Sequence, residues 1–471
     1  MVLRRHNLIQ QAEGVVGKGW VVTKEELIEP YLRDETPEPI RPSPAGNLIL
    51  IKPSTTEQVS RILKLANEQK ISIFPVGGRT GLVGGAVPTE PGIVLSLERM
   101  NRVEIDRRNP MAIIGAGATL KDLIEASDDA DLFFPLHPGD EGAQIGGLIA
   151  TNAGGVRAVK YGVMRSYVKG VDAVLPTGEV LKLGGRLIKN NTGYDLMDLI
   201  VGSEGTLCVI VKAVIKLYPR SKFKVTLVVP FDNRLDALTV VPRILQSGVI
   251  PLAIEYVEMK DIAEAAEHLG EEWPVHRGEA QLIMVLTGTS YDVLLLGCEE
   301  ISQVCEQRTN YEPLIAETRE EQDRILRIRS NIYNILKPKI VDVLDVTVPP
   351  SNLGRLIVLV EGIASKYGVQ LSVCGHAGDG NLHVSIMKEE KGRIQYVAEA
   401  KKKIYETTVA LEGAITGEHG IGKLRTSEIG LVLSPKEIEL MKTIKGLFDP
   451  NNILNPGNVF PQDRSIPHTQ D

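Results

Sequence analysis

The stretch that decides the fold is IGGLIATNAGG at residues 145–155, in which two glycine pairs flank an apolar run and a Thr-Asn step. It is followed by KYG at 160–162, KNNTGYDL at 189–196 and GSEGTL at 202–207. Glycine lets a backbone approach a ligand closely, because it has no side chain. These segments therefore have to be interpreted together with the other glycine-rich parts of the chain.

A second glycine-rich segment, PVGGRTGLVGG at residues 75–85, follows a strand-like run at 71–74. Upstream, Ser54 to Glu57 predicts a capping box, and residues 59–66 have helical apolar spacing. Closely spaced backbone N–H groups make an anion-binding concavity, and Arg79 adds positive charge. The segment matches neither the G-x-G-x-x-G dinucleotide fingerprint nor a Walker loop. A tight structural turn is the alternative.

Two short segments near the other end carry three of the eight histidines, GHAGDGNLH at 375–383 and GEHG at 417–420. His376 and His383 flank a Gly-Asp-Gly turn, so the chain can fold back and aim both rings at one point. Glu418 and His419 stand between glycines. Imidazole and carboxylate are the ligands of a catalytic divalent metal such as Zn²⁺. Two turn histidines on a glycine-rich loop are the alternative.

Taken together, in this order and spacing, the glycine-rich segments resemble the FAD domain shared by vanillyl-alcohol oxidase and p-cresol methylhydroxylase. The histidine segments, and the ending FDPNNILNPG at 448–457, resemble the D-2-hydroxyacid dehydrogenase branch of that family. This branch includes D-lactate dehydrogenases, the flavin subunit of glycolate oxidase and D-2-hydroxyglutarate dehydrogenase. The resemblance covers roughly residues 20 to 460.

The resemblance implies FAD held between two glycine-rich arms, which are residues 75–85 (the first arm) and residues 145–155 (the second arm). In some relatives a histidine of the first arm is bonded to the flavin, but residues 75–85 contain none, so we expect non-covalent FAD. His137, near the second arm, is expected to line a turn. The implied cofactor-binding residues are Pro75, Val76, Gly77, Gly78, Arg79, Thr80, Gly81, Pro138, Gly146, Gly147, Thr151, Asn152, Gly154, Gly155, Glu204, Gly205 and Asn455.

The resemblance also implies a metal held by His376, His383 and Glu418, with zinc expected and manganese or iron as alternatives. The metal would bind the carboxylate and hydroxyl of a 2-hydroxy acid and lower the hydroxyl pKa. His419 would then take the hydroxyl proton as general base, and the Cα hydride would pass to flavin N5. Arg329 matches the family arginine that pairs with the substrate carboxylate, with Arg327 as the competing candidate.

Two positions bear on substrate size. Val343 stands where some relatives have a lysine, and Ser385 stands where 2-hydroxyglutarate enzymes have asparagine. Both departures argue against a second substrate carboxylate and favour D-lactate or glycolate.

Composition is consistent with this interpretation and excludes several classes. The 471 residues provide for two or three domains, and the net charge of −7 gives no reason to expect nucleic-acid binding. No apolar run reaches the roughly 20 residues of a membrane helix. Four cysteines suggest a reducing, cytoplasmic compartment, and without a C-x-x-C pair we expect no iron–sulfur cluster in this chain. Cys298 and Cys305 are expected on one helix face, and Cys208 as a small buried residue.

The predicted fold class is α+β, with a two-part FAD domain of the p-cresol methylhydroxylase type and a cap domain built on an antiparallel sheet. An N-terminal helical segment is expected at 1–40, the FAD domain at 41–219, the substrate and metal cap at 220–433, and a C-terminal helix and tail returning to the FAD domain at 434–471. The cap is expected to alternate strands (225–230, 253–257, 281–287) with helices (235–246, 353–367, 394–411). Ser434 should cap a last helix at 438–448, with proline at its first position.

We therefore predict an FAD-dependent D-2-hydroxyacid dehydrogenase that passes electrons to an external protein, either an iron–sulfur subunit or an electron-transferring flavoprotein. Such a partner could hold the enzyme at a membrane periphery, and a homodimer is left open. The alternatives are a D-2-hydroxyglutarate dehydrogenase, a flavin-binding subunit with little activity alone, and a metal hydrolase that would leave the glycine loops unexplained.

Overall fold

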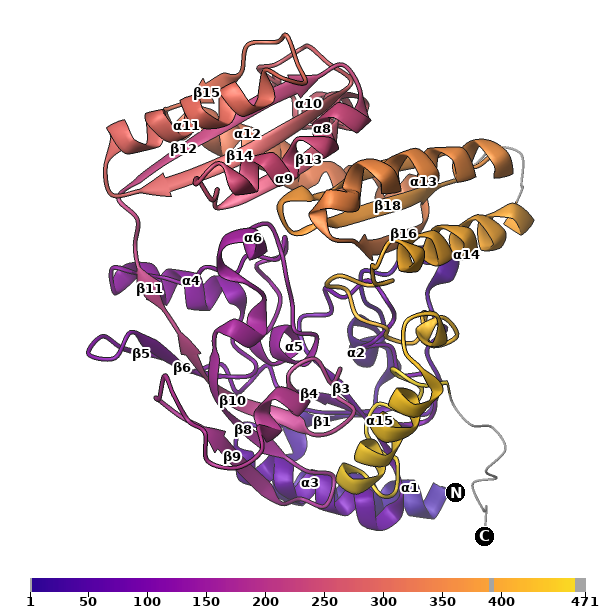
Figure 1. Cartoon of the computed structure of the whole chain (residues 1–471). Coiled ribbons are helices and arrows are strands. Elements are labelled where there is room, and N and C mark those ends of the chain that lie inside the picture. The colour runs from indigo at the N-terminus through magenta and orange to yellow at the C-terminus, as the bar shows by residue number, and fades with distance from the viewer. Residues whose placement is uncertain (1, 389–393, 462–471) are drawn as a thin grey trace.

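The computed structural model describes residues 2–388 and 394–461. The N-terminal half forms the lower part of the molecule in Figure 1, and a seven-stranded sheet with its helices lies above it. The yellow C-terminal segment runs back down beside the N-terminal half (Figure 1). The architecture is α+β, as predicted.

The first sheet contains β1 (Val21–Val22), β2 (Ile49–Ile51), β4 (Gly92–Ser96) and β3 (Ser72–Val76) in that spatial order. β2, β4 and β3 are parallel, and helix α3 (Thr56–Gln69) makes the crossover from β2 to β3. The predicted capping box is wrong by one residue. Thr55, not Ser54, caps α3 by accepting from the Gln58 N–H, because the Gln58 side chain instead binds the Ser54 N–H.

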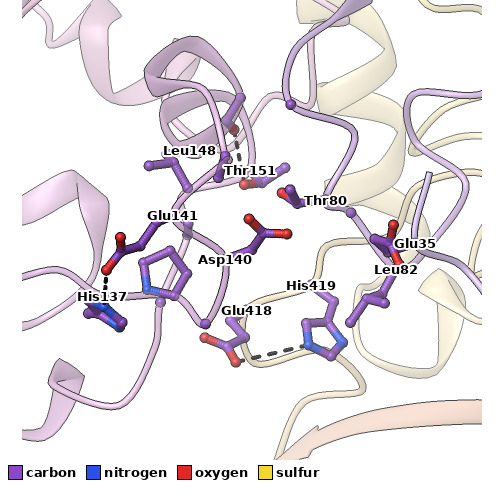
Figure 2. A pocket seen from close by; sticks show the side chains of 18 of the residues that line it. Glu35, Thr80, Leu82, His137, Asp140, Glu141, Leu148, Thr151, Glu418 and His419 are labelled. Carbon is purple, nitrogen blue, oxygen red and sulfur yellow. Dashed lines mark hydrogen bonds and ion pairs between the residues drawn. The ribbon is translucent and has the colours of Figure 1, made fainter. Parts of the chain in front are cut away.

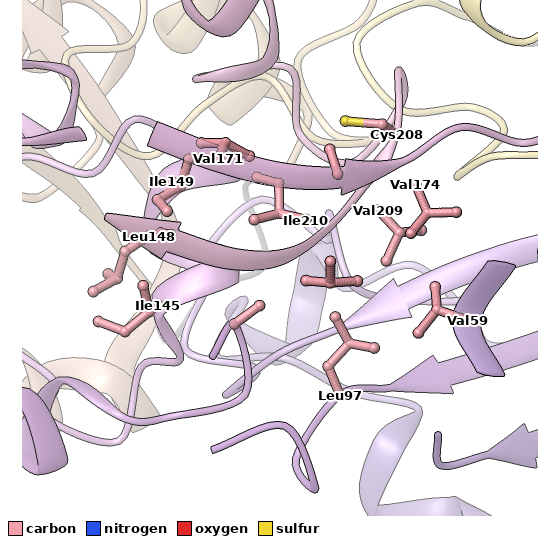
Figure 3. Close-up of a cluster of buried hydrophobic side chains, with 14 of the residues drawn as sticks. Val59, Leu97, Ile145, Leu148, Ile149, Val171, Val174, Cys208, Val209 and Ile210 are labelled. Atoms are coloured by element: carbon pink, nitrogen blue, oxygen red, sulfur yellow. The ribbon is translucent and has the colours of Figure 1, made fainter. Parts of the chain in front are cut away.

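The second sheet is antiparallel, in the order β5 (Val103–Asp106), β6 (Met111–Gly115), β10 (Val209–Lys216), β8 (Val168–Val174) and β9 (Val180–Gly184). Helices α4 (Leu120–Asp129), α5 (Ile145–Ala150), α6 (Ala158–Tyr161) and α7 (Leu196–Ile200) connect its strands. Figure 3 shows apolar side chains of α5 packed against those of β8 and β10. This core fixes the glycine-rich segment that begins at α5.

Residues 1–40 are less helical than expected. The segment contains α1 (Val2–Val16) and the short α2 (Glu25–Ile28), but Val21 and Val22 between them pair with β2. β-branched residues fit a half-buried pleated edge, and the first sheet offers that edge. Leu8, Ala12 and Val16 of α1 pack into the core of the N-terminal half.

A two-stranded pair, β7 (Leu132–Phe133) and β11 (Tyr218–Pro219), lies where the chain leaves the N-terminal half. The seven-stranded sheet follows, and all of its neighbouring strands are antiparallel. Its spatial order is β15 (Leu314–Ala316), β12 (Phe223–Phe231), β14 (Ala280–Gly288), β13 (Ala253–Glu258), β17 (Leu371–His376), β18 (Asn381–Met387) and β16 (Ile340–Thr347).

Helices cover both faces of this sheet. One face packs against α8 (Arg234–Thr239), α9 (Val241–Gln246), α11 (Tyr291–Cys305), α13 (Leu353–Tyr367) and α14 (Ile394–Ala410). The other face packs against α10 (Met259–Leu269) and α12 (Arg319–Leu336). The single helix predicted at 235–246 is divided, because Pro242 in the first turn of α9 has no N–H to continue α8.

The C-terminal segment extends the first sheet. Helix α15 (Pro435–Phe448) starts at Ser434 with a capping box to Glu437 and proline at its first position, as predicted. Beyond it, the Ile73 N–H donates to the Ile453 carbonyl at 2.7 Å, and the Asn455 N–H donates to the Ile73 carbonyl at 2.8 Å. Residues 453–455 thus lie beside β3, the strand that leads into the first glycine loop.

Candidate functional site

Four adjacent strands present polar side chains on one face of the seven-stranded sheet. Glu255 of β13 pairs in register with His376 of β17, and Asp345 of β16 pairs with His383 of β18. Because Cys374 pairs with His383, the two histidines lie on the same face, two residues apart in register. The hairpin turn needs Gly380, which has a φ of 85° and whose added Cβ would lie 1.9 Å from the Val348 carbonyl oxygen.

The two histidines converge on one carboxylate oxygen. His376 Nε2 lies 3.2 Å and His383 Nε2 lies 3.3 Å from Glu418 Oε1. In tetrahedral zinc sites, bonds of roughly 2.0–2.2 Å place neighbouring ligand atoms roughly 3.3 Å apart. The donor types and spacing therefore fit a divalent transition metal.

Asp345 shapes the loop that carries Glu418. Its Oδ2 accepts hydrogen bonds from the N–H groups of Gly417, Glu418 and His419 at 2.9, 2.8 and 2.7 Å, and from the Thr416 hydroxyl at 2.8 Å. Its Oδ1 lies 3.5 Å from His383 Nδ1. One buried carboxylate thus holds the loop and faces a histidine, and His419 stacks on His383 with ring centroids 5.0 Å apart.

Charges set the protonation of this cluster. Burial opposes protonation of His376, but the carboxylates of Glu255 and Glu418 outweigh it and hold its pKa well above the usual value. Burial likewise opposes ionisation of Glu418, but the two histidines lower its pKa. For His419 burial dominates and lowers the pKa. A site in which carboxylates raise the pKa of buried imidazoles favours positive charge, which a metal ion can supply.

The two candidate arginines of α12 differ in environment. The Arg329 side chain is 12% exposed, and its Nη2 lies 2.8 Å from Glu255 Oε2. The Arg327 side chain is 53% exposed and pairs with Glu271 at 2.6 Å. Both line the cavity described below, but only Arg329 is held against the histidine cluster.

Two carboxylates of the site, Glu255 and Asp345, were not among the predicted site residues. The signal was present in the sequence, since these acids stand in mainly apolar strands, AIEYV at 253–257 and IVDVLDV at 340–346, the second of which also holds Asp342. A charge buried in a strand requires a partner. Their partners, His376 and His383, follow from the strand register, which the sequence does not show.

A cavity of about 1090 Å³ joins this cluster to both glycine-rich arms. That exceeds the roughly 300–1,000 Å³ of sites for drug-sized ligands, as a dinucleotide with a substrate would require. Figure 2 shows Glu418 and His419 facing Thr80, Asp140 and Thr151 across it. It is lined by all predicted metal and catalytic residues, and by Pro75, Val76, Gly77, Gly78, Arg79, Thr80, Gly81, Pro138, Gly146, Gly147, Thr151, Gly154, Glu204, Gly205 and Asn455.

Asn152 and Gly155 are not among the residues that line the cavity. The Asn152 side chain accepts from the Arg165 N–H at 2.9 Å, so it holds the loop together. Gly155, with a φ of 129°, packs against the His137 carbonyl, which a Cβ would approach to 2.4 Å. Both residues shape the second arm from behind. His137 lies in the turn, as expected, with Nε2 3.3 Å from Glu141.

The glycine arms provide room and donors for a ligand. A Cβ on Gly147 would meet no atom within 4 Å, so it would project into the cavity. Among the described residues, no acceptor pairs with the backbone N–H groups of Gly78, Arg79, Thr80 and Gly81. Unpaired amide donors of successive residues suit an anion such as a pyrophosphate. The first arm therefore fits the phosphates of FAD.

The glycine arms and the histidine cluster are physically joined. A Cβ on Gly154 would lie 2.6 Å from Glu418 Oε2. The Glu204 carboxylate accepts from the N–H groups of Ile421 and Gly422 at 2.8 and 2.7 Å, just beyond Glu418 and His419. Asn455 donates to the Glu204 carbonyl at 2.9 Å. Hence Glu204 links its own segment to the loop that carries Glu418 and to the C-terminal segment at Asn455.

Cys298 and Cys305 lie apart from this chemistry, whereas Cys208 and Cys374 are among the residues that line the cavity. Cys298 and Cys305 are buried on one face of α11, and burial raises the pKa of Cys305 and of Cys208 to about 12. All four cysteines are free. None of the helices in the described ranges has the length and apolar character needed to cross a bilayer.

Comparison with known families identifies both halves of this arrangement. Residues 48–184 match the FAD binding domain model, and residues 220–459 match the model for the C-terminal domain of FAD linked oxidases. The chain is 45% identical to D-lactate dehydrogenase of Archaeoglobus fulgidus over 429 residues, which is 91% of this chain and 95% of the relative. The chain belongs to the FAD-linked oxidase family. It is therefore an FAD-dependent oxidoreductase, as the sequence predicted.

Other relatives of this FAD-linked oxidase agree. It is 34% identical to D-lactate dehydrogenase of Anaerostipes hadrus (93% of this chain, 94% of the relative) and to glycolate oxidase subunit GlcD of Bacillus subtilis (94% and 98%). Its fold matches that of p-cresol methylhydroxylase with a TM-score of 0.77 at 16% identity, covering 97% of both chains. 4-Ethylphenol oxidase from Gulosibacter chungangensis matches with a TM-score of 0.76 at 18% identity, covering 98% of both. The predicted fold type is thus confirmed.

Proposed function

We propose that this protein oxidises a small D-2-hydroxy acid, D-lactate or glycolate, to the 2-oxo acid, with metal assistance and an external protein as electron acceptor. The observation that carries the proposal is the convergence of His376 and His383 on Glu418, in one cavity with the glycine arms. The relatives named D-lactate dehydrogenase and glycolate oxidase subunit support the substrate class.

The residues assigned to each group follow from the cavity. The N–H groups of residues 78–81 would hold the FAD pyrophosphate, and the second arm around Gly147 and Thr151 would hold the rest of the cofactor. His376, His383 and Glu418 would hold the metal. When bound, FAD accepts two electrons as a hydride, and a divalent metal makes a coordinated hydroxyl more acidic.

The protein itself supplies orientation and a base. The Arg329 guanidinium would pair with the substrate carboxylate. His419 would remove the hydroxyl proton at a ring nitrogen, and its lowered pKa keeps it neutral and able to accept that proton near pH 7. His419 Nε2 also lies 4.0 Å from Glu418 Oε1, so a fourth metal ligand is the competing role.

The wall facing the substrate argues for a small acid. Val343 pairs in register with Ser385, and both line the cavity. Neither side chain is charged, so neither could pair with a second substrate carboxylate. The alternative substrate, D-2-hydroxyglutarate, is represented by a relative from Stutzerimonas stutzeri at 29% identity.

We assign the domains as an N-terminal segment at 1–40, the FAD domain at 41–219, the cap at 220–433 and a returning tail at 434–471. The electron acceptor would be an iron–sulfur protein or an electron-transferring flavoprotein. If the chain is instead a flavin-binding subunit, it will need that partner for appreciable turnover but not for flavin reduction.

Anaerobic single-turnover reduction of the bound flavin tests the proposal. D-lactate or glycolate should bleach the flavin faster than D-2-hydroxyglutarate, and L-lactate should be poor. Removal of the metal with a chelator should slow reduction without releasing FAD. Reduction that prefers 2-hydroxyglutarate would refute the substrate assignment, and reduction unaffected by complete metal removal would refute metal assistance.

A further inference from the structure

Glu255 is a buried acid with two cationic or imidazole partners. It lies in β13, is 1% exposed, and belongs to the cavity wall. Its Oε1 lies 2.7 Å from His376 Nδ1, and its Oε2 lies 2.8 Å from Arg329 Nη2. The two oxygens of one carboxylate thus face His376, a proposed metal ligand, and Arg329, the proposed partner of the substrate carboxylate.

The contact with His376 determines how that ring can act. An ionised carboxylate only accepts hydrogen bonds, so Nδ1 carries the proton. The lone pair of a neutral His376 is then on Nε2, the atom directed at Glu418. Carboxylate partners of this kind orient metal-binding histidines and increase their basicity.

The contact with Arg329 determines where the guanidinium points. Arg329 comes from α12, which packs over this face of the sheet, while Glu255 comes from the sheet itself. Nη2 forms an ion pair with Glu255 Oε2, while neither that oxygen nor the buried Arg329 Nε has a hydrogen-bond partner among the described residues. A guanidinium held at one end with a free N–H in the cavity wall is prepared to receive a carboxylate.

We propose that Glu255 is a positioning residue that couples the metal site to the capture of the substrate carboxylate, by holding His376 and Arg329 with its two oxygens. This inference rests on the proposed function and adds to it. Neither the metal ligands nor Arg329 alone fixes the distance between the metal and the carboxylate. Glu255 does, because it touches one residue from each set.

The coupling requires Oε1 to accept from His376 and Oε2 to keep its negative charge beside Arg329. A glutamine side chain at this position has no charge, one acceptor and one N–H₂ donor, so it would weaken the charge-assisted contact with both partners and would oppose the partner that faces its N–H₂ group. Glu255→Asp keeps the charge but shortens the arm, so it could not reach both partners. Both substitutions should therefore weaken both tasks.

The experiment compares Glu255→Gln and Glu255→Asp with Glu258→Gln in the FAD-loaded protein. Glu258 is a matched control, because it is a buried glutamate of the same strand on the opposite face, paired with Arg234 and Lys260. Zn²⁺ affinity is measured by chelator competition. Pyruvate affinity is measured from the flavin absorbance change in metal-free protein, where Arg329 acts without the metal. FAD content and the thermal midpoint report folding.

We expect Zn²⁺ affinity to fall about 10–100-fold and pyruvate affinity to fall at least about tenfold in both Glu255 variants, with Glu258→Gln within twofold of wild type. Loss of only one of the two affinities, or values equal to the control, would overturn the coupling. If wild type binds no Zn²⁺, the metal-assisted function fails first and this inference fails with it. Hydroxy-acid oxidation with wild-type affinities in the Glu255 variants would remove the inference alone.

Discussion

Replacing Asp345 with asparagine should weaken both metal binding and the fold. The substitution keeps the shape of the side chain but removes its charge. Four donors meet Asp345 Oδ2, three of them consecutive backbone N–H groups of the loop that carries Glu418. Burial opposes ionisation of Asp345, but the neighbouring histidines and these donors hold its pKa well below the usual value.

The magnitude follows from these contacts. A hydrogen bond to a charged group contributes roughly 1 kcal/mol more than a neutral one. Four such bonds, which are not additive, give a loss of roughly 2–4 kcal/mol in the free energy of unfolding. If the new N–H₂ group occupies the Oδ1 position, it faces His383 Nδ1 and favours the tautomer with the proton on Nε2. That tautomer has no lone pair on Nε2, the atom that faces Glu418, so metal affinity should fall about 10–100-fold.

Urea unfolding and Zn²⁺ competition on the same preparation measure the two effects. Asp342→Asn is the control, because this carboxylate of the same strand pairs with buried Arg425 and not with a histidine. The control should lose stability but keep metal affinity within twofold. A destabilised Asp345→Asn protein with wild-type metal affinity would refute the reasoning, since Asp345 would then support the fold alone.

The remaining predictions test separate contacts. Gly154→Ala should displace Glu418 and lower metal content measured by elemental analysis while FAD stays bound, whereas Gly147→Ala should weaken FAD binding by fluorescence titration and leave the metal in place. Arg425→Met removes the buried partner of Asp342 and leaves only Lys401, 3.5 Å away, so it should lower the free energy of unfolding by up to about 3–5 kcal/mol. A loss below about 1 kcal/mol, typical of exposed pairs, would contradict its structural role. Because burial lowers the pKa of His419 and only the neutral ring accepts a proton, flavin reduction should rise with pH along a limb below the usual histidine value. This pH dependence should vanish in His419→Ala, and an unchanged pH profile of flavin reduction would mean that another residue is the base.

The fold type and most of the elements could be predicted from the sequence, because these depend on local patterns. Glycine pairs, apolar periodicity and helix caps act over a few residues, so α13 and the start of α15 were predicted closely. Local patterns gave wrong predictions where a nearby residue formed a competing hydrogen bond or interrupted a helix. Gln58 took the Ser54 N–H and moved the cap of α3 to Thr55, and Pro242 divided a helix that apolar spacing alone would continue.

The histidine motifs by themselves determined which residue types could form a metal site, since His376, His383 and Glu418 are chemically suited to it wherever they lie. Only the tertiary structure decided which partners they have. Glu255 and Asp345 come from strands far along the chain from the histidines they face, and a shift of one residue in register would turn either carboxylate to the other side of the sheet. Register between distant strands is set by the packing of the whole sheet, and so the charges that orient the site cannot be obtained from any local segment of the chain.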